Sequence, residues 1–145
     1  MIYTPITKKA MTVAYNAHHG QTDPSGVPYI FHPLHLAEQM ADEVTTAAAL
    51  LHDVLEDTPI TLEDLRKEGF PESVLKVVEL LTHREEVPYL DYVRALKGNP
   101  AAKAIKLADL THNSNVTRLN EVTAEDIDYL ARYRAAFEIL QSGEA

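Results

Sequence analysis

The chain has 145 residues, of which 46% are hydrophobic and 24% charged, and this balance fits one domain over residues 1–145 with its own core. Its formal net charge of −9 argues against a general nucleic-acid binder, which normally presents a basic face. The absence of cysteine excludes disulfides and thiolate metal sites, and no apolar run could span a membrane. The first residues also lack the features of a signal peptide, so we expect a cytoplasmic protein whose partners include neither membrane nor nucleic acid.

The predicted elements are helices, each marked by a capping residue or a proline at its start or a glycine near its end. Hydrophobic residues recur in them at helical spacing, and no segment alternates as a strand would. The stretch over residues 21–28 is polar and contains two prolines and a glycine, which indicates a loop. The predicted helices span residues 7–19, 32–40, 42–57, 61–69, 71–81, 88–97, 99–113 and 123–143. The predicted fold class is therefore all-α and compact.

The most unusual stretch closes the central predicted helix. His52, Asp53, Glu56 and Asp57 directly follow the apolar run 47–51 (AAALL), with Glu56 one turn from both His52 and Asp53. The proline that follows should end the helix, so the last two acids lie at the negative end of its dipole, where each costs about 0.3–1 kcal/mol. A divalent cation is the simplest compensation for this crowding of charge. The alternative is a solvated helix end that happens to carry acids.

A second polar stripe lies on the helix predicted over residues 99–113. Lys106, Asp109, His112 and Asn113 are spaced at i, i+3, i+6 and i+7, so they share one face. This stripe could simply be the solvated face of the helix. However, Asp109 stands between an alanine and a leucine, a core-like neighbourhood, and Asn113 points the same way one turn later. These features favour a functional stripe.

Together the two stretches suggest a metal site without sulfur ligands, a donor set that suits Mn, Fe, Zn, Co or Ni. His52 and Asp53 lie about 100° apart on a helix, so both reach one ion only if it sits over the edge between them. For the other two ligands we select Asp109 and His32, although His32 taken alone is more simply a capping or core histidine. The remaining histidines are weaker candidates, with His18 a possible support for the ligands and His35 expected to face solvent: His18, His19, His35, His83 and His112.

Five motifs follow one another along the chain: 17–21 (AHHGQ), 25–26 (SG), 28–33 (PYIFHP), 48–58 (AALLHDVLEDT) and 106–109 (KLAD) followed by His112 and Asn113. In these motifs the chain resembles the HD-domain metal-dependent phosphohydrolases, and within them the hydrolase domain of RelA/SpoT-type enzymes. The resemblance covers roughly residues 6 to 140 and implies a compact helical bundle with a metal site between central helices. It also implies a stand-alone small alarmone hydrolase, similar to the single-domain form of animals.

The resemblance implies a role for each matching residue. It makes the metal ligands His32, His52, Asp53 and Asp109, with Mn²⁺ as the typical ion and other divalent transition metals as alternatives. It makes Glu56 and Asp57 the catalytic acids and Asn113 a substrate contact. The implied reaction belongs to the stringent response: the 3′-diphosphate of (p)ppGpp leaves as pyrophosphate, and GDP or GTP remains.

The sequence departs from the family where the guanine nucleotide is held. Asp23-Pro24 stands where the long enzymes carry an Arg-Lys pair, and Gln21 and Thr22 stand where the animal form keeps basic residues. Leu110 and Asn115 likewise occupy places where a basic residue is common. The substrate should then be held by the metal, by Asn113 and by loop groups such as Ser25 and Tyr29. We therefore expect weaker discrimination between bases.

Two alternatives to a (p)ppGpp hydrolase remain at this point. One is an HD phosphohydrolase that acts on another nucleotide, such as NADPH, and the weakened basic loop keeps it open. The other is a regulatory domain that binds a nucleotide without turnover. The intact candidate ligands and the intact Glu56-Asp57 pair argue against the second. In each case the partner is a small nucleotide, and the oligomeric state is left open.

Overall fold

The computed structural model describes residues 1–143 and confirms the all-α fold class. Within that range the only β-type pairing is an isolated bridge between Thr22 and Pro28, and no helix is both long and apolar enough to cross a membrane. One short 3₁₀ helix, η1, covers Val116–Arg118. The α-helices are α1 (Pro5–Ala17), α2 (Phe31–Glu38), α3 (Glu43–Leu51), α4 (Val54–Asp57), α5 (Leu62–Lys67), α6 (Glu72–Leu81), α7 (Tyr89–Leu96), α8 (Pro100–Asn113) and α9 (Ala124–Gln141).

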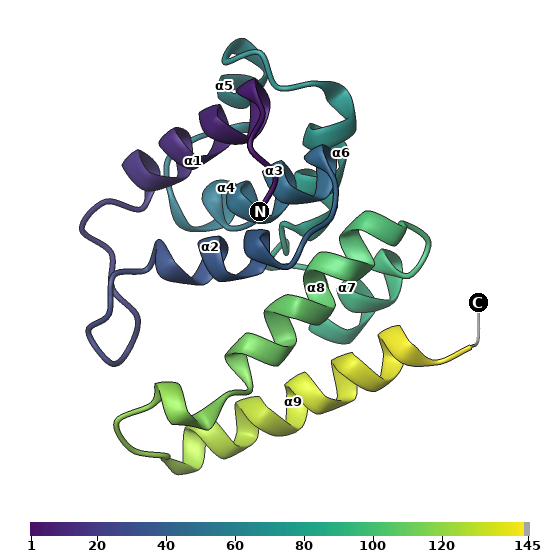
Figure 1. Ribbon diagram of the computed structural model, residues 1–145. Helices are drawn as coiled ribbons and strands as arrows, with labels where there is room; N and C mark the ends of the chain where they lie inside the picture. The colour runs from purple at the N-terminus through teal and green to yellow at the C-terminus, as the bar shows by residue number, and fades with distance from the viewer. Residues whose placement is uncertain (144–145) are drawn as a thin grey trace.

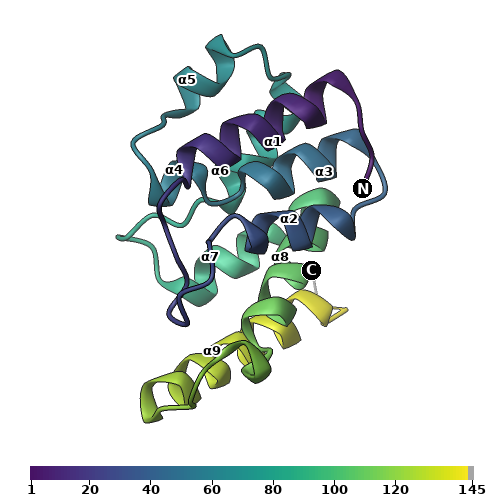
Figure 2. The ribbon, with the colours of Figure 1, turned by 60° about the vertical axis from the view of Figure 1, so that its left-hand side comes forward.

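Helix α3 lies at the centre of the bundle and contacts α1, α2, α6 and α8 (Figures 1 and 2). Its alanines, Ala47, Ala48 and Ala49, are fully buried, and their small side chains let the neighbouring helices approach closely. Leu50 and Leu51 complete the buried segment. The end of α3 therefore delivers the next residues, His52 and Asp53, directly into the interior.

Helix α8 joins this central group to the C-terminal part of the bundle. It contacts α2, α3 and α6 on one side and α7 and α9 on the other, and Figure 1 shows α9 running along its outer side. Ala102, Ile105 and Leu110 bury the inner face of α8. Because Asp109 lies on the same helix, this packing fixes it opposite the end of α3.

The first helix differs by two residues at each end from its predicted range of 7–19. Thr4 caps it with a reciprocal pair of hydrogen bonds to Thr7, of 3.1 and 2.8 Å, and Pro5 occupies the first turn. The helix ends at Ala17, and the chain then turns through Gly20, whose φ of 85° favours glycine. The earlier end places His18 at the helix terminus, facing inward.

The central helix, predicted as one piece over residues 42–57, is broken between α3 and α4. Asp53 has φ −104° and ψ 1°, outside regular helix. The backbone N–H of His52 donates a long hydrogen bond of 3.4 Å to the carbonyl of Ala49, three residues earlier, which is the pattern of a 3₁₀ turn. The break corrects the prediction and removes a geometric difficulty. In an unbroken helix His52 and Asp53 diverge by about 100°, whereas here Nε2 of His52 and Oδ2 of Asp53 lie 2.9 Å apart.

Candidate metal centre and active site

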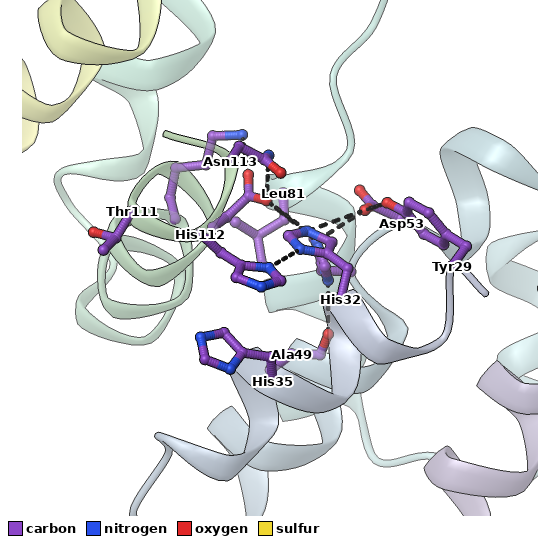
Figure 3. Close-up of polar contacts among 12 residues, drawn as sticks. Tyr29, His32, His35, Ala49, Asp53, Leu81, Thr111, His112 and Asn113 are labelled. Carbon is purple, nitrogen blue, oxygen red and sulfur yellow. Dashed lines mark hydrogen bonds and ion pairs between the residues drawn. The ribbon is translucent and has the colours of Figure 1, made fainter. Parts of the chain in front are cut away.

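The four residues expected to bind a metal converge in the interior, although they come from three separate parts of the chain. Nε2 of His32, in the first turn of α2, lies 2.9 Å from Oδ1 of Asp109 on α8 and 3.9 Å from Oδ2 of Asp53. Nε2 of His52 lies 3.7 Å from the same Asp109 oxygen. Figure 3 shows the ring of His32 at the centre of these contacts. Even without Asp53, the side chains of His32, His52 and Asp109 offer one ligand atom each, and these three atoms lie within 4.8 Å of one another.

The orientation of His52 fits a metal ligand. Its Nδ1 lies 2.7 Å from the carbonyl oxygen of Ala49, which can only accept, so Nδ1 carries a proton and Nε2 is the atom that faces the cluster, where it can bind an ion in place of a proton. Nε2 is buried without a hydrogen-bond partner, because Asp53 is close to it but not in a hydrogen-bonding direction. Burial lowers the pKa of His52, but Asp53 and Asp109 outweigh it and raise that pKa well above its usual value. The carboxylates thus favour a positive charge here, which a proton or a divalent ion can supply.

Each oxygen of Asp109 has its own partners. Oδ2 accepts a bond of 2.8 Å from the ammonium of Lys106, and Oδ1 faces His32 and accepts a bond of 3.1 Å from the amide of Asn113. Burial works to raise the pKa of Asp109, but Lys106 and the two histidines bring it well below its usual range. Asp109 is therefore an ionised carboxylate held in one orientation.

Tyr29 supports Asp53 directly. Its hydroxyl donates a short hydrogen bond to Oδ2 of Asp53, and its ring lies between His18 and His32, with centroids 4.9 and 5.7 Å away. Burial, together with the charge of Asp53, raises the pKa of Tyr29, so the phenol stays protonated as a donor. The ring contact also places His18 behind the cluster, in the supporting position expected of it.

The first turn beyond α1 is tied to the helix that carries the two acids. Nδ1 of His18 lies 2.8 Å from Oε1 of Gln21, and the amide nitrogen of Gln21 donates a bond of 3.0 Å to the backbone carbonyl of Asp57. His18 is buried, and burial lowers its pKa. The pair therefore holds the C-terminal end of α4 in place.

Glu56 and Asp57 lie at the mouth of the cluster. Their carboxylate oxygens and those of Asp53 lie within 4.8 Å of one another. Oε1 of Glu56 accepts a bond of 2.8 Å from the backbone N–H of His83, which fixes one side of this carboxylate. Partial burial and the charge of Asp53 raise the pKa of both Glu56 and Asp57. Both acids are thus better proton acceptors than free carboxylates.

A third histidine, His112, extends the cluster outward. Nδ1 of His112 lies 2.7 Å from Nδ1 of His32, and the ring of His35 stacks on His112 with centroids 4.1 Å apart (Figure 3). Burial and the guanidinium of Arg118 lower the pKa of His112 to about 4, so its imidazole is neutral at physiological pH. His35 is exposed, as expected, although its ring has this partner.

Beside the cluster lies a cavity of about 320 Å³, within the size range of small-molecule sites. It is bounded by the loop over residues 21–28, the end of α8 and the face of α9 that carries Tyr129 and Tyr133. The three residues expected to contact substrate, Ser25, Tyr29 and Asn113, all line it, as does His32.

Known proteins resemble this chain in sequence and in fold. Residues 10–118 match the HD domain family. The chain belongs to the HD domain family. It is 40% identical over 121 residues to the bifunctional (p)ppGpp synthase/hydrolase SpoT of Escherichia coli, which covers 73% of this chain and 17% of SpoT. It is 36% identical over 141 residues to a guanosine-3′,5′-bis(diphosphate) 3′-pyrophosphohydrolase of Borreliella burgdorferi, which covers 86% of this chain and 20% of the relative.

The HD domain therefore spans about a fifth or less of the length of these curated relatives. One solved structure matches this chain over most of its own length. It is a metazoan ortholog of SpoT described as hydrolysing ppGpp and playing a role in starvation responses. It matches with a TM-score of 0.77 and 26% identity over 100% of this chain and 90% of its own. The predicted resemblance to RelA/SpoT-type hydrolase domains is confirmed.

Two of the positions predicted to lack a substrate-binding cation, Leu110 and Gln21, are not among the residues that line the cavity. Leu110 is 1% exposed and packs in the core, because it lies about 100° around α8 from Asp109. The amide of Gln21 is engaged by His18 and Asp57, as described above. The lack of charge at these two positions therefore says less about nucleotide recognition than the sequence suggested. Asn115 does line the cavity, and it caps η1 by accepting a bond of 3.1 Å from Thr117 N–H.

The sequence reasoning also missed a cation that the fold supplies. Arg118, at the end of η1, lines the cavity, and its Nη2 lies 3.8 Å from Oδ2 of Asp23 in the loop. Its Nη1 donates to the carbonyl of His112 at 3.0 Å and approaches Oδ1 of Asn113 at 3.4 Å, while its own carbonyl accepts from Ser25 at 2.8 Å. The one available signal was that Arg118 is the first basic residue after Lys106.

Proposed function

We propose that this HD domain hydrolyses (p)ppGpp, releasing the 3′-diphosphate as pyrophosphate and leaving GDP or GTP. The observation that carries the proposal is the cluster of His32, His52, Asp53 and Asp109 beside a cavity that can hold a nucleoside. The names of the relatives support it, because they describe enzymes that act on ppGpp. Two acids at the mouth of the cluster supply the proton acceptor that hydrolysis requires.

We assign the four clustered side chains to one divalent transition-metal ion, with Mn²⁺ as the first candidate. Two imidazole nitrogens and two carboxylates without sulfur form a suitable donor set, and the free lone pair on His52 Nε2 is aimed into it. Bound there, the ion supplies a Lewis acid for a phosphate oxygen and lowers the pKa of a coordinated water. Asp53 and Asp109 together balance its double positive charge.

The residues around the cluster have separate tasks in the proposed reaction. Tyr29 and Lys106 hold Asp53 and Asp109 in single orientations through their hydrogen bonds. Glu56 accepts the proton of the attacking water, since one of its oxygens is fixed by His83 N–H and the other is left for water. Asp57 lies beside it and keeps its pKa raised.

We propose that Arg118 takes over much of the charge-assisted recognition that the loop lacks. Its guanidinium lies at the cavity wall, and the hydrogen bonds within residues 1–143 engage only its Nη1. Its Nη2 makes a long ion pair of 3.8 Å with Asp23, so Nε and Nη2 can still donate to a substrate. Ser25 and Asn113 add polar contacts on either side of it. Arg118 would thus add a cation to the expected contacts, which are the metal, Asn113, Ser25 and Tyr29.

Arg118→Ala is expected to raise the KM for ppGpp about ten- to a hundredfold, because one charge-assisted contact is worth roughly 1.5–3 kcal/mol. kcat should change little, since the contact binds ground state and transition state alike. Steady-state kinetics on both proteins measures the effect. The matched control is Arg134→Ala, whose side chain is 84% exposed on α9. A KM within twofold of wild type for Arg118→Ala means that other residues hold the nucleotide.

The direct test of the proposed reaction is product identification. Purified protein with Mn²⁺ is incubated with ppGpp, pppGpp, NADPH and simple nucleotides, and the products are resolved by anion-exchange chromatography and ³¹P NMR. The expected result is pyrophosphate with GDP from ppGpp and with GTP from pppGpp. Loss of phosphate from NADPH with ppGpp left intact would favour the other phosphohydrolase activity, and binding without any turnover would favour a regulatory domain.

A further inference from the structure

We infer that His112 is a positioning residue. Its Nδ1 accepts a hydrogen bond from Nδ1–H of His32, and this leaves the lone pair of His32 on Nε2, which faces the metal site. This inference rests on the proposed function, in that His32 is taken as a ligand. It concerns a residue that the proposed reaction does not otherwise use.

The contact between the two rings has the geometry of a hydrogen bond. Their Nδ1 atoms are 2.7 Å apart, and the planes differ by only 5° with centroids 5.0 Å apart, so each nitrogen lies close to the plane of the other ring. Two imidazole nitrogens at this distance attract only if one carries a proton and the other does not. The pair His32–His112 therefore has two arrangements, which differ in the direction of donation.

The opposite edge of His32 selects between them once an ion is bound, because the 2.9 Å contact of Nε2 with the carboxylate Oδ1 of Asp109 needs a proton on Nε2 only while no ion lies between them. Its Nε2 faces Oδ1 of Asp109 at 2.9 Å and Oδ2 of Asp53 at 3.9 Å, the two oxygens that a metal ion would share with it. To bind an ion, Nε2 must be unprotonated, so the proton must be on Nδ1 and His32 must be the donor. His112 is then the acceptor, with its own proton on Nε2.

The surroundings of His112 hold it in this role. Arg118 donates to its backbone carbonyl at 3.0 Å, which fixes the end of α8, and the ring of His35 covers one face of its imidazole at 26°. Ligating histidines usually donate to a carboxylate, a backbone carbonyl or water. An imidazole acceptor fixes the tautomer of His32 without adding a further negative charge to a site that must receive an anionic substrate.

The test is Mn²⁺ affinity, measured by isothermal titration of metal-free protein. His112→Phe keeps a ring but removes the acceptor, and we expect about 10- to 100-fold weaker binding, the usual cost of losing such a partner. His112→Asn is expected to stay within about threefold of wild type, because its amide oxygen can occupy the place of Nδ1. The matched control, His35→Phe, keeps a ring that can stack on His112 but removes the imidazole, and it should bind as wild type does. Equal losses in the Phe and Asn variants, or no loss in Phe, would overturn the inference.

A second readout does not depend on folding of a variant. In wild-type protein loaded with Zn²⁺, ¹⁵N NMR of the histidine rings is expected to show the proton of His32 on Nδ1 and that of His112 on Nε2. The reverse assignment, with the proton of His32 on Nε2, overturns the inference and also removes His32 from the proposed ligands. If wild type binds no divalent ion at His32, the proposed metal site and this inference both fail. If wild type binds the ion and the affinity does not change in the His112 variants, only the inference fails.

Discussion

Glu56→Gln is expected to lower kcat for ppGpp hydrolysis by about 10²–10⁴, the scale of a positioned proton acceptor. The amide keeps the size of the side chain but cannot take a proton from water. Since Glu56 is not among the four proposed ligands, Mn²⁺ affinity should be unchanged, and calorimetry on the same protein preparation checks this. Partial burial and the charge of Asp53 raise the pKa of Glu56. As the pH decreases, activity should therefore begin to fall at a higher pH than it would with a free glutamate, and the variant should lose this acidic limb of the pH–rate profile.

The matched control for that experiment is Glu85→Gln, an exposed acid in the loop before α7. It should turn over at the wild-type rate. If Glu56→Gln also turns over at the wild-type rate, the assignment of the proton acceptor is wrong and Asp57 becomes the next candidate. A loss of metal binding together with activity would instead make Glu56 a ligand.

Asp109→Asn is expected to abolish Mn²⁺ binding and hydrolysis together, and also to destabilise the protein. The substitution leaves the ammonium of Lys106 buried without its carboxylate partner, which typically costs about 3–5 kcal/mol of unfolding free energy. Urea denaturation of the metal-free proteins measures this cost, and calorimetry measures the metal affinity. The structure thus predicts two losses from a single atom change.

The double variant Asp109→Asn with Lys106→Met separates these losses. Removing the ammonium should restore much of the stability, because no uncompensated charge then remains. It should not restore metal binding, since the ligand oxygen is still absent. Full recovery of hydrolysis in the double variant would show that Asp109 acts only through Lys106.

The helices could be predicted because residues close in the sequence determine where they begin. Asp42, Thr61, Asn99 and Thr123 each cap a helix through their own side chains, as the sequence indicated. The break at His52-Asp53 could not be predicted in this way. Hydrophobic spacing continues across it, and the deviation depends on where the His52 ring finds the Ala49 carbonyl in the folded chain.

The candidate ligands could be predicted because charged groups in apolar stretches are costly and therefore informative. Arg118 carried no such signal, and His112 was indicated only as part of the polar stripe on its helix. Both residues make contacts with residues distant in the chain. Arg118 meets Asp23 only because η1 folds back onto the first loop, and His112 meets His32 only because α8 packs against α2. Contacts of this kind depend on tertiary packing, which local patterns do not encode.

The most direct test of the central claim is anomalous diffraction from crystals soaked in Mn²⁺. The expected result is a single strong peak at roughly 2.0–2.3 Å from His32 Nε2, His52 Nε2 and one oxygen each of Asp53 and Asp109. The acids Glu56 and Asp57, which with Asp53 form the second group of close carboxylates, should lie outside direct contact with the ion. A peak between those three acids, or no peak at the histidines, would contradict the account.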